Sequence, residues 1–515
     1  MEPYKVEWIP LTPAGEMAER EYDVLIVGSG AGGAAVLRRL AELWGGRGRK
    51  VGMLEAGGLL LPTHGQNLPT VTADRVVTEL FARMSTPLGE RLPDYPDAKL
   101  TFGLGGRTLF WTGGTPRMPA CETADWPLSR QELERYYRLA EQAMDVTDGL
   151  AGGSALQDVL LSRLREHGYP HAAALPMAVR LDASRGGRLS SGSVFSSIDH
   201  LAYAQYRMPF DLAAGARVTE VLLDGGRAAG VKAVSGGCTH VIHARTVVVA
   251  AGGFITPQIL LHSGVPGQAI GRYLTNHSTV RATGRLREGS PPAGSAVINV
   301  PQTEEAPYQI QLFGPAPHYA YPREHPAPVG DGPVDVQMNG FARVESRAEN
   351  RVYLDPVQLD ADGVPLLQVA FTRSSRDLEA IDRTAQAMRQ AAGALGLSLE
   401  EADGASPPKA LPPGDDNHEA CTCRMGRHPD TSAADPYGQI HGVPGLYVAD
   451  NSLLPSIGAA NPTLTTVALA IRTADCIAER LGGVTAAPPA ARPQQTHRQH
   501  RRTAPRAEEP PPQRS

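Results

Sequence analysis

A short apolar run followed by closely spaced glycines limits the possible folds of this 515-residue chain more than any other feature. Residues 24–27 form a β-branched run, as expected for a strand buried on both faces of a parallel sheet. A glycine-rich turn then leads into a helical pattern, and a second apolar run follows at residues 51–54. The sequence therefore predicts a βαβ unit with parallel strands.

The glycines of this turn are spaced as in turns that hold the pyrophosphate of a dinucleotide. Gly28 permits the tight turn, Gly30 lets the backbone approach the pyrophosphate, and Gly33 lets the helix pack closely on the strand. Glu55 follows the second run and can accept a hydrogen bond from a ribose hydroxyl. A glutamate rather than an arginine there argues against a 2′-phosphate, so the turn favours NAD or FAD and leaves both open.

The composition excludes several classes of protein. A formal net charge of −5 gives no reason to expect nucleic acid as a partner. No run approaches the roughly 18 consecutive apolar residues of a membrane span, and the first 20 residues contain no apolar signal segment. The five cysteines are sparse and odd in number, so we expect reduced thiols in a cytoplasmic protein and no metal site.

Later segments predict a second domain. Residues 246–253 form another buried run that ends in glycines ahead of a helix, so we expect it to return to the first sheet. Residues 279–340 instead alternate apolar and polar side chains, which is typical of antiparallel strands. The predicted fold class is α/β: a Rossmann-like domain with a parallel sheet, plus a second domain built on an antiparallel sheet with helices.

The two domains are expected to be interwoven along the chain. A tail rich in proline and arginine and without large aliphatic residues is predicted to be disordered. The expected boundaries are 20–150, 206–278 and 417–483 for the Rossmann-like domain, 151–205 and 279–416 for the second domain, and 484–515 for the tail.

Two polar residues towards the C-terminal end are candidate catalytic groups. The oxidation of an alcohol needs a base near neutral pH, which the imidazole of His418 can supply. It also needs a partner that hydrogen-bonds the substrate oxygen, which Asn461 can be. Asn461 and Pro462 match the N-cap and first position of the last helix. The dipole at that helix start would favour negative charge, such as that of a reduced flavin at N1.

Residues 102–114 carry five glycines among thirteen residues, interleaved with bulky aromatic side chains. This pattern indicates backbone pressed against a large planar ligand. A tight turn with packed aromatic side chains is the alternative.

Taken together, these motifs resemble the glucose–methanol–choline (GMC) oxidoreductase family of FAD enzymes. The form GGRTLFWTGGTPR resembles its pyranose-oxidase-like branch. The resemblance implies that the Rossmann-like domain binds FAD and that the second domain binds substrate. The motifs that carry it, in the order of the family, are GSGAGG with LEAGG, GGRTLFWTGG, VVVAAGGFITPQILLHSG, AIGRYLTNH, HEACTCRMG and NPTLTTVALAIRTAD.

The resemblance also implies which residues bind FAD. Those on the adenosine side are Gly28, Gly30, Gly33 and Glu55, with Val218 at the adenine through its backbone, and Ala31 is also assigned to the cofactor. The Gly105–Gly106 loop would line the isoalloxazine. The other residues that the resemblance assigns to the cofactor are Thr108, Trp111, Ala251, Gly252, Asp450, Pro462 and Thr463.

The sequence departs from the family at two positions. Cys421 stands where members usually have glycine. Phe110 stands where a histidine of the related branch can be joined to the flavin, and because phenylalanine has no nucleophilic atom, we expect non-covalent FAD.

The resemblance implies that the protein oxidises a CH–OH group. His418 would accept the hydroxyl proton, Asn461 would orient the oxygen, and hydride would pass to flavin N5. A sugar or glycoside is the expected substrate, and oxygen, a quinone or a protein stays open as the electron acceptor. The alternatives are a lyase that keeps FAD for structure and a non-catalytic flavin-binding protein.

Overall fold

The computed structural model describes residues 9–45, 47–68, 75–88, 92–181, 192–286, 294–315, 333–401 and 405–482. The segment 484–515, which the sequence predicts to be disordered, lies outside these ranges. Within them, no helix combines the length and the apolar character needed to cross a membrane.

The βαβ unit predicted from the glycine turn forms the centre of a five-stranded parallel sheet. β2 (Val24–Val27), α2 (Ala31–Trp44) and β3 (Val51–Glu55) follow one another as expected. The run predicted to return to this sheet is β14 (Val247–Val249), which pairs with β2 in parallel. The order β10-β3-β2-β14-β23 is completed by β10 (Asp211–Ala214) and β23 (Leu446–Val448).

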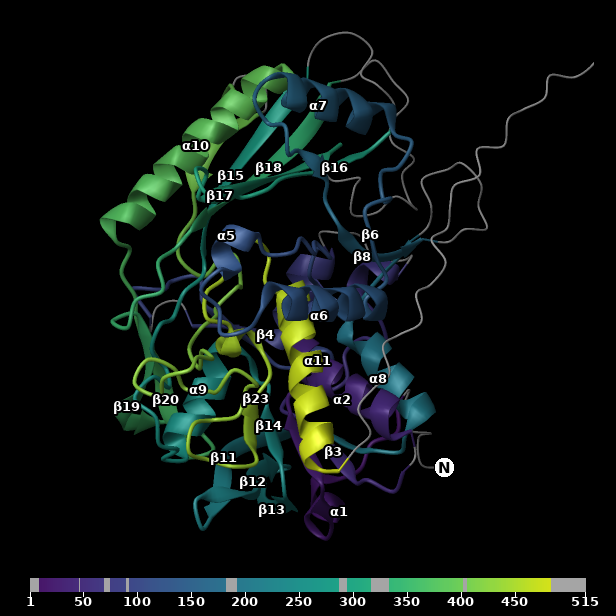
Figure 1. Cartoon of the computed structure of the whole chain (residues 1–515), viewed down its shortest axis with the longest axis vertical. Coiled ribbons are helices and arrows are strands. Elements are labelled where there is room, and N and C mark those ends of the chain that lie inside the picture. Colours follow the sequence, from purple (N-terminus) through teal and green to yellow (C-terminus); the bar gives the residue numbers. More distant parts are fainter. Residues whose placement is uncertain are drawn as a thin grey trace, which may run out of the picture.

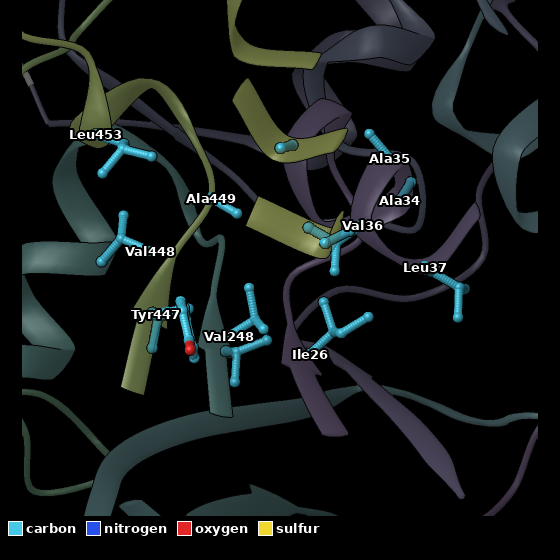
Figure 2. Packing of buried hydrophobic residues seen from close by; sticks show 14 of the residues in the cluster. Ile26, Ala34, Ala35, Val36, Leu37, Val248, Tyr447, Val448, Ala449 and Leu453 are labelled. Carbon is cyan, nitrogen blue, oxygen red and sulfur yellow. The ribbon is translucent and has the colours of Figure 1, made fainter. Parts of the chain in front are cut away.

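The core of this domain lies between the parallel sheet and its helices. Figure 2 shows Ile26, Val248 and Val448 on three neighbouring strands, with Val36 of α2 above Ile26, and all four are buried. The last helix, α11 (Thr463–Arg480), runs beside α2 (Figure 1). Because elements cover both faces of the sheet, its strands are apolar runs rather than alternating ones.

The second domain is built on an antiparallel sheet, as the alternating pattern predicted. Its long strands are β15 (His277–Leu286), β18 (Val334–Arg343), β17 (Tyr308–Gly314) and β16 (Ala296–Val300), which pair in that order. Its edges are β21 (Leu397–Ser398) and β22 (Ser406–Ala410), which both pair with β15, and β7 (Ala173–Ala174), which pairs with β16.

Two helices cover one face of this antiparallel sheet (Figure 1). They are α10 (Ser375–Leu395) and α7 (Ala155–Glu166), and their apolar side chains form a core with β15 to β18. The opposite face carries polar side chains and is turned towards the parallel sheet. The predicted fold class is confirmed.

Shorter elements complete the part of the chain that the structure describes. α8 (Ser197–Arg207) packs on α2. The domain boundaries expected from the sequence stay a prediction. The other helices of more than four residues are α1 (Ala14–Ala18), α6 (Arg130–Ala143), α9 (Gly252–His262) and the π-helical turn Val76–Phe81. The longer remaining strands are β8 (Met177–Leu181), β11 (Ala216–Asp224), β12 (Arg227–Ser235), β13 (Cys238–Ala244), β19 (Arg351–Leu359) and β20 (Pro365–Ala370).

Two helical glycines give a test of the packing between α2 and the sheet. A Cβ at Gly33 would lie 2.0 Å from the carbonyl oxygen of Gly28, whereas a Cβ at Gly393 in α10 would meet no atom within 4 Å. Gly33→Ala should therefore cost about 1–3 kcal/mol of stability, as overpacking does. Gly393→Ala should stabilise by about 0.5–1 kcal/mol, because alanine is the better helix former. Thermal unfolding of both variants measures this, and shifts of the same sign would contradict the close approach.

Candidate active site

A cavity of about 500 Å³ lies between the two domains. Residues that follow or end four parallel strands line it, including Gly28, Glu55, Ala251 and Asp450. Ligands of open α/β sheets bind at these carboxyl ends of strands, and the volume is within the range of ligand sites. The antiparallel sheet forms the facing wall of the cavity.

The glycine turn meets the cavity as dinucleotide binding requires. Gly28 has φ of 98°, and a Cβ there would lie 2.4 Å from the carbonyl oxygen of Ala250. Gly30 is the N-cap of α2, lines the cavity and has open space where a Cβ would be. A phosphate can therefore approach the backbone and the N-terminal N–H groups of α2. Gly33 lies behind the turn, against Gly28, and is not part of the cavity wall.

Glu55 lines the cavity, and its buried carboxylate ties two loops together. One oxygen accepts from the backbone N–H and the hydroxyl of Ser29, at 3.0 and 2.6 Å. The other accepts from the N–H groups of Gly57 and Gly103, at 2.9 and 3.2 Å. Burial raises the pKa of Glu55, although these donors oppose the rise. All four lone-pair positions are used, so the expected ribose hydroxyl would have to share or displace a donor.

The loop with alternating glycines and aromatic residues lies against the glycine turn. Gly106 begins a 3-10 turn (Gly106–Leu109), and a Cβ there would lie 3.1 Å from Cα of Gly30. Phe110 and Trp111 line the cavity. Thr108 also lines it and donates to the carbonyl oxygen of Gly105, which lies outside the cavity wall. The loop thus combines the tight turn with the aromatic surface for a planar ligand.

The remaining residues expected at the cofactor fall mostly on the same cavity. Ala31, Val218, Gly252 and Thr463 line it, as do the two candidate catalytic residues. Pro462 lies outside the wall.

The start of the last helix differs from the expectation by one residue. α11 begins at Thr463, so Pro462 is the N-cap and not the first helical residue. The side chain of Asn461 does not cap the helix. Its Oδ1 instead accepts from Nε2 of Gln309 at 3.1 Å and from Nε2 of Gln311 at 2.6 Å. Asn461 therefore bonds to two side chains of the antiparallel sheet instead of capping α11, and the sequence around Asn461 does not reveal these partners.

His418 is half-buried, and its two chain neighbours are held by hydrogen bonds. Arg107, from the aromatic loop, donates to the carbonyl oxygen of Asn417 at 2.7 Å and pairs with Glu419. These bonds fix both chain neighbours of His418. Its Nδ1 lies 3.9 Å from Oδ2 of Asp416, and its ring centroid lies 5.0 Å from that of His277.

Electrostatics keep both imidazoles neutral. Burial, together with His277 and Arg107, lowers the pKa of His418 well below its usual range. Burial lowers the pKa of His277 to about 4, although its Nδ1 donates to the carbonyl oxygen of Gly458 at 3.0 Å. Burial and the charge of Glu419 raise the pKa of Asp416 to about 7. At neutral pH His418 is therefore a free base beside a carboxyl that can hold a proton.

His277, Asp416 and His418 have ligand atoms within 4.8 Å of one another and could hold a metal ion. The sparse cysteines of the sequence predicted no metal site, but they say nothing of histidine and carboxylate ligands. This group was not visible in the sequence because His277 begins β15, far along the chain from the other two residues.

Sequence reasoning also missed a row of polar side chains on the antiparallel sheet. Arg281, Asn339 and Gln311 stand opposite one another on β15, β18 and β17, and all three line the cavity. The signal was present as polar residues at alternate positions of apolar strands. Alternation shows that a strand has two faces but not that the polar face is enclosed by another domain.

Comparison with known proteins identifies the family. Sequence models described as GMC oxidoreductase match residues 103–279 and 346–470. The chain is 33% identical over 410 residues to a C-glycoside 3-oxidase of Arthrobacter globiformis, with 75% of this chain and 76% of the relative covered. The chain belongs to the GMC oxidoreductase family.

Further comparisons agree with this membership. The chain is 25% identical over 442 residues to a pyranose 2-oxidase of Tricholoma matsutake, with 75% of this chain and 74% of the relative covered. In fold it is similar to a variant of Aspergillus oryzae formate oxidase, with a TM-score of 0.64, 15% identity, and 89% of this chain and 98% of the other covered. GMC oxidoreductases bind FAD, and the glycine turn, the start of α2 and the cavity fit that cofactor.

The buried carboxyl of this GMC site gives a test by pH. Because the pKa of Asp416 rises from its ordinary 3.8 to about 7 on folding, the folded protein keeps a proton that the unfolded chain releases between these values. Asp416 therefore lowers wild-type stability as the pH rises from about 4 to about 7, and by a constant amount above that. The unfolding temperature of Asp416→Asn minus that of wild type should rise over this range and then level off.

The control is Asp430→Asn, at an exposed position. Its difference from wild type should stay small throughout the same titration. A difference for Asp416→Asn that does not change with pH would contradict the burial of a protonated carboxyl.

Proposed function

We propose that this protein is an FAD-dependent oxidoreductase that oxidises a CH–OH group of a sugar or glycoside. The observation that carries the proposal is that a neutral, half-buried imidazole, His418, and an amide, Asn461, line the same cavity as the glycine turn. A base and a hydrogen-bond partner for the substrate oxygen are what the oxidation of an alcohol needs.

The residues that would hold FAD are those of the turn and the loops around it. Gly28, Gly30 and Ala31 would bind the pyrophosphate with the start of α2, and Val218 would lie at the adenine. The aromatic loop around Gly106 would lie at the isoalloxazine. FAD supplies an acceptor for hydride at N5.

The residues of the chain supply the proton chemistry. Nδ1 of His418 is buried and lies 3.9 Å from Oδ2 of Asp416 without a hydrogen bond, which leaves Nε2 for the hydroxyl proton of the substrate. Nδ2 of Asn461 would donate to the oxygen on which negative charge develops. With both groups in place, the hydrogen on carbon can leave as hydride.

The polar wall supports a polyhydroxylated substrate. Gln311, Gln337 and Asn339 line the cavity from two adjacent strands. Amide side chains both donate and accept hydrogen bonds, as recognition of sugar hydroxyls requires. The names of two relatives, a C-glycoside 3-oxidase and a pyranose 2-oxidase, agree with this class.

The first test of the proposal is the flavin itself. The purified protein should contain FAD, and acid precipitation should release it, because Phe110 offers no atom for a covalent link. Anaerobic mixing with sugars and glycosides should bleach the flavin for at least one of them. A protein that cannot be loaded with FAD would overturn the proposal. Flavin that stays with the precipitate would contradict the non-covalent link alone.

The second test removes the base. His418→Ala should slow flavin reduction by roughly 10²–10⁴-fold with FAD still bound, the usual worth of general base catalysis. Because the pKa of His418 is lowered, the loss of rate that its own protonation causes should come only well below pH 6.5. Stopped-flow reduction measures both effects. The control is His167→Ala, an exposed position that should keep the wild-type rate, and an equal rate for His418→Ala would exclude it as the base.

A further inference from the structure

The side chain of Asn461 is held from the other domain. Gln309 and Gln311 lie two residues apart on β17, and both direct Nε2 to Oδ1 of Asn461. The three side chains are buried, with exposed fractions of 1%, 2% and 7%. Gln309 lies outside the wall of the cavity, whereas Gln311 and Asn461 line it.

These two bonds fix the direction of the Asn461 amide. An amide group has one end that accepts and one end that donates. Among the described residues, the two glutamines are the only hydrogen-bond partners of this side chain, and both meet its oxygen. Turning the amide over would place its N–H groups against two N–H donors. The donor end is therefore the end left for the cavity.

We propose that Gln309 and Gln311 are positioning residues that hold Asn461 with Nδ2 towards the substrate oxygen. The inference rests on the proposed function, in which this oxygen gains negative charge as the hydroxyl proton leaves. A donor stabilises that charge, whereas the carbonyl end of the same amide would repel it. The two glutamines thus decide whether Asn461 assists or opposes the reaction.

The backbone of the same loop is held independently. The N–H of Ala459 donates to Oε1 of Gln302 at 2.7 Å, and the carbonyl oxygen of Gly458 accepts from His277. The loop 458–461 therefore keeps these supports when one of the two β17 glutamines is changed. The direction of the Asn461 amide can therefore be tested separately from the position of the loop backbone.

The deciding variant is Gln311→Glu, which keeps the size of the side chain. An ionised carboxylate only accepts, so it should draw Nδ2 of Asn461 towards itself and, against the one remaining donor, Gln309, turn Oδ1 to the substrate. Flavin reduction should slow by about 10²-fold, as when one donor to a developing oxyanion is lost. At low pH the introduced carboxyl is protonated and donates again, so the loss should shrink as the pH falls. Because Gln311 also lines the cavity, the matching readout of binding comes from Gln309→Glu, outside the wall, in which the substrate dissociation constant should change much less than the rate.

The matched control is the same change in Asn461→Ala, because a double-mutant cycle isolates the pair. Without an amide to turn, Gln311→Glu should add little further loss and little pH dependence. An equal loss in both backgrounds would mean that the charge acts directly on the reaction, and would overturn the inference. A wild-type rate for the single variant would overturn it as well.

A second variant covers failure to fold. If Gln311→Glu does not retain FAD, Gln309→Glu is used instead. It also replaces a donor to Asn461 by an acceptor, but from outside the cavity wall, and the same results support or overturn the inference. If substrate reduces the flavin of the wild type, but the single variant keeps the wild-type rate or loses equal rate in both backgrounds, the inference is wrong and the proposed function stands. Wild type that no alcohol reduces sinks the proposed function and, with it, the inference.

Discussion

Hydrogen bonds between the antiparallel sheet and the loop 458–461 determine where the two domains meet at the site. His277, Gln309 and Gln311 of the sheet each hold a group of this loop, which leads into α11, and Gln302, which follows β16, holds another. The sheet is thereby both the wall of the substrate cavity and the support of Asn461. Because these groups are buried, leaving any of them unpaired would cost about 1–3 kcal/mol. The antiparallel domain therefore helps to fix the position of the loop 458–461 and of the Asn461 side chain.

Glu55 has the corresponding role on the cofactor side. Its carboxylate joins the glycine turn at Ser29 to Gly103 in the aromatic loop. The hydroxyl of Ser29 in turn accepts from the N–H of Gly105. Four donors offset the burial of a charge, which would be unfavourable without them. One side chain thus holds together the two loops that are expected to contact the pyrophosphate and the isoalloxazine of FAD.

Local patterns predicted the βαβ unit, the return of β14 to its sheet and the antiparallel second domain, because burial on one or both faces of a strand is recorded in its periodicity. They also selected His418 and Asn461, and the structure brings both to one cavity. What the sequence could not show depends on contacts between distant segments. The meeting of Asp416 with His277 is one example. Another is the burial of the polar face of β17, where Gln311 bonds to the side chain of Asn461, which therefore does not cap α11.

In the proposed reaction a hydrogen leaves the CH–OH carbon as hydride for the bound flavin. The most direct measurement is anaerobic flavin reduction by the best glycoside donor, unlabelled and then deuterated at the carbon that is oxidised. The account predicts bleaching in step with product formation, and slower bleaching with deuterium. Conversion of the glycoside while the flavin stays oxidised would contradict the account and indicate a lyase on the same fold. Equal rates with hydrogen and deuterium would show that this transfer does not limit reduction, contrary to the account.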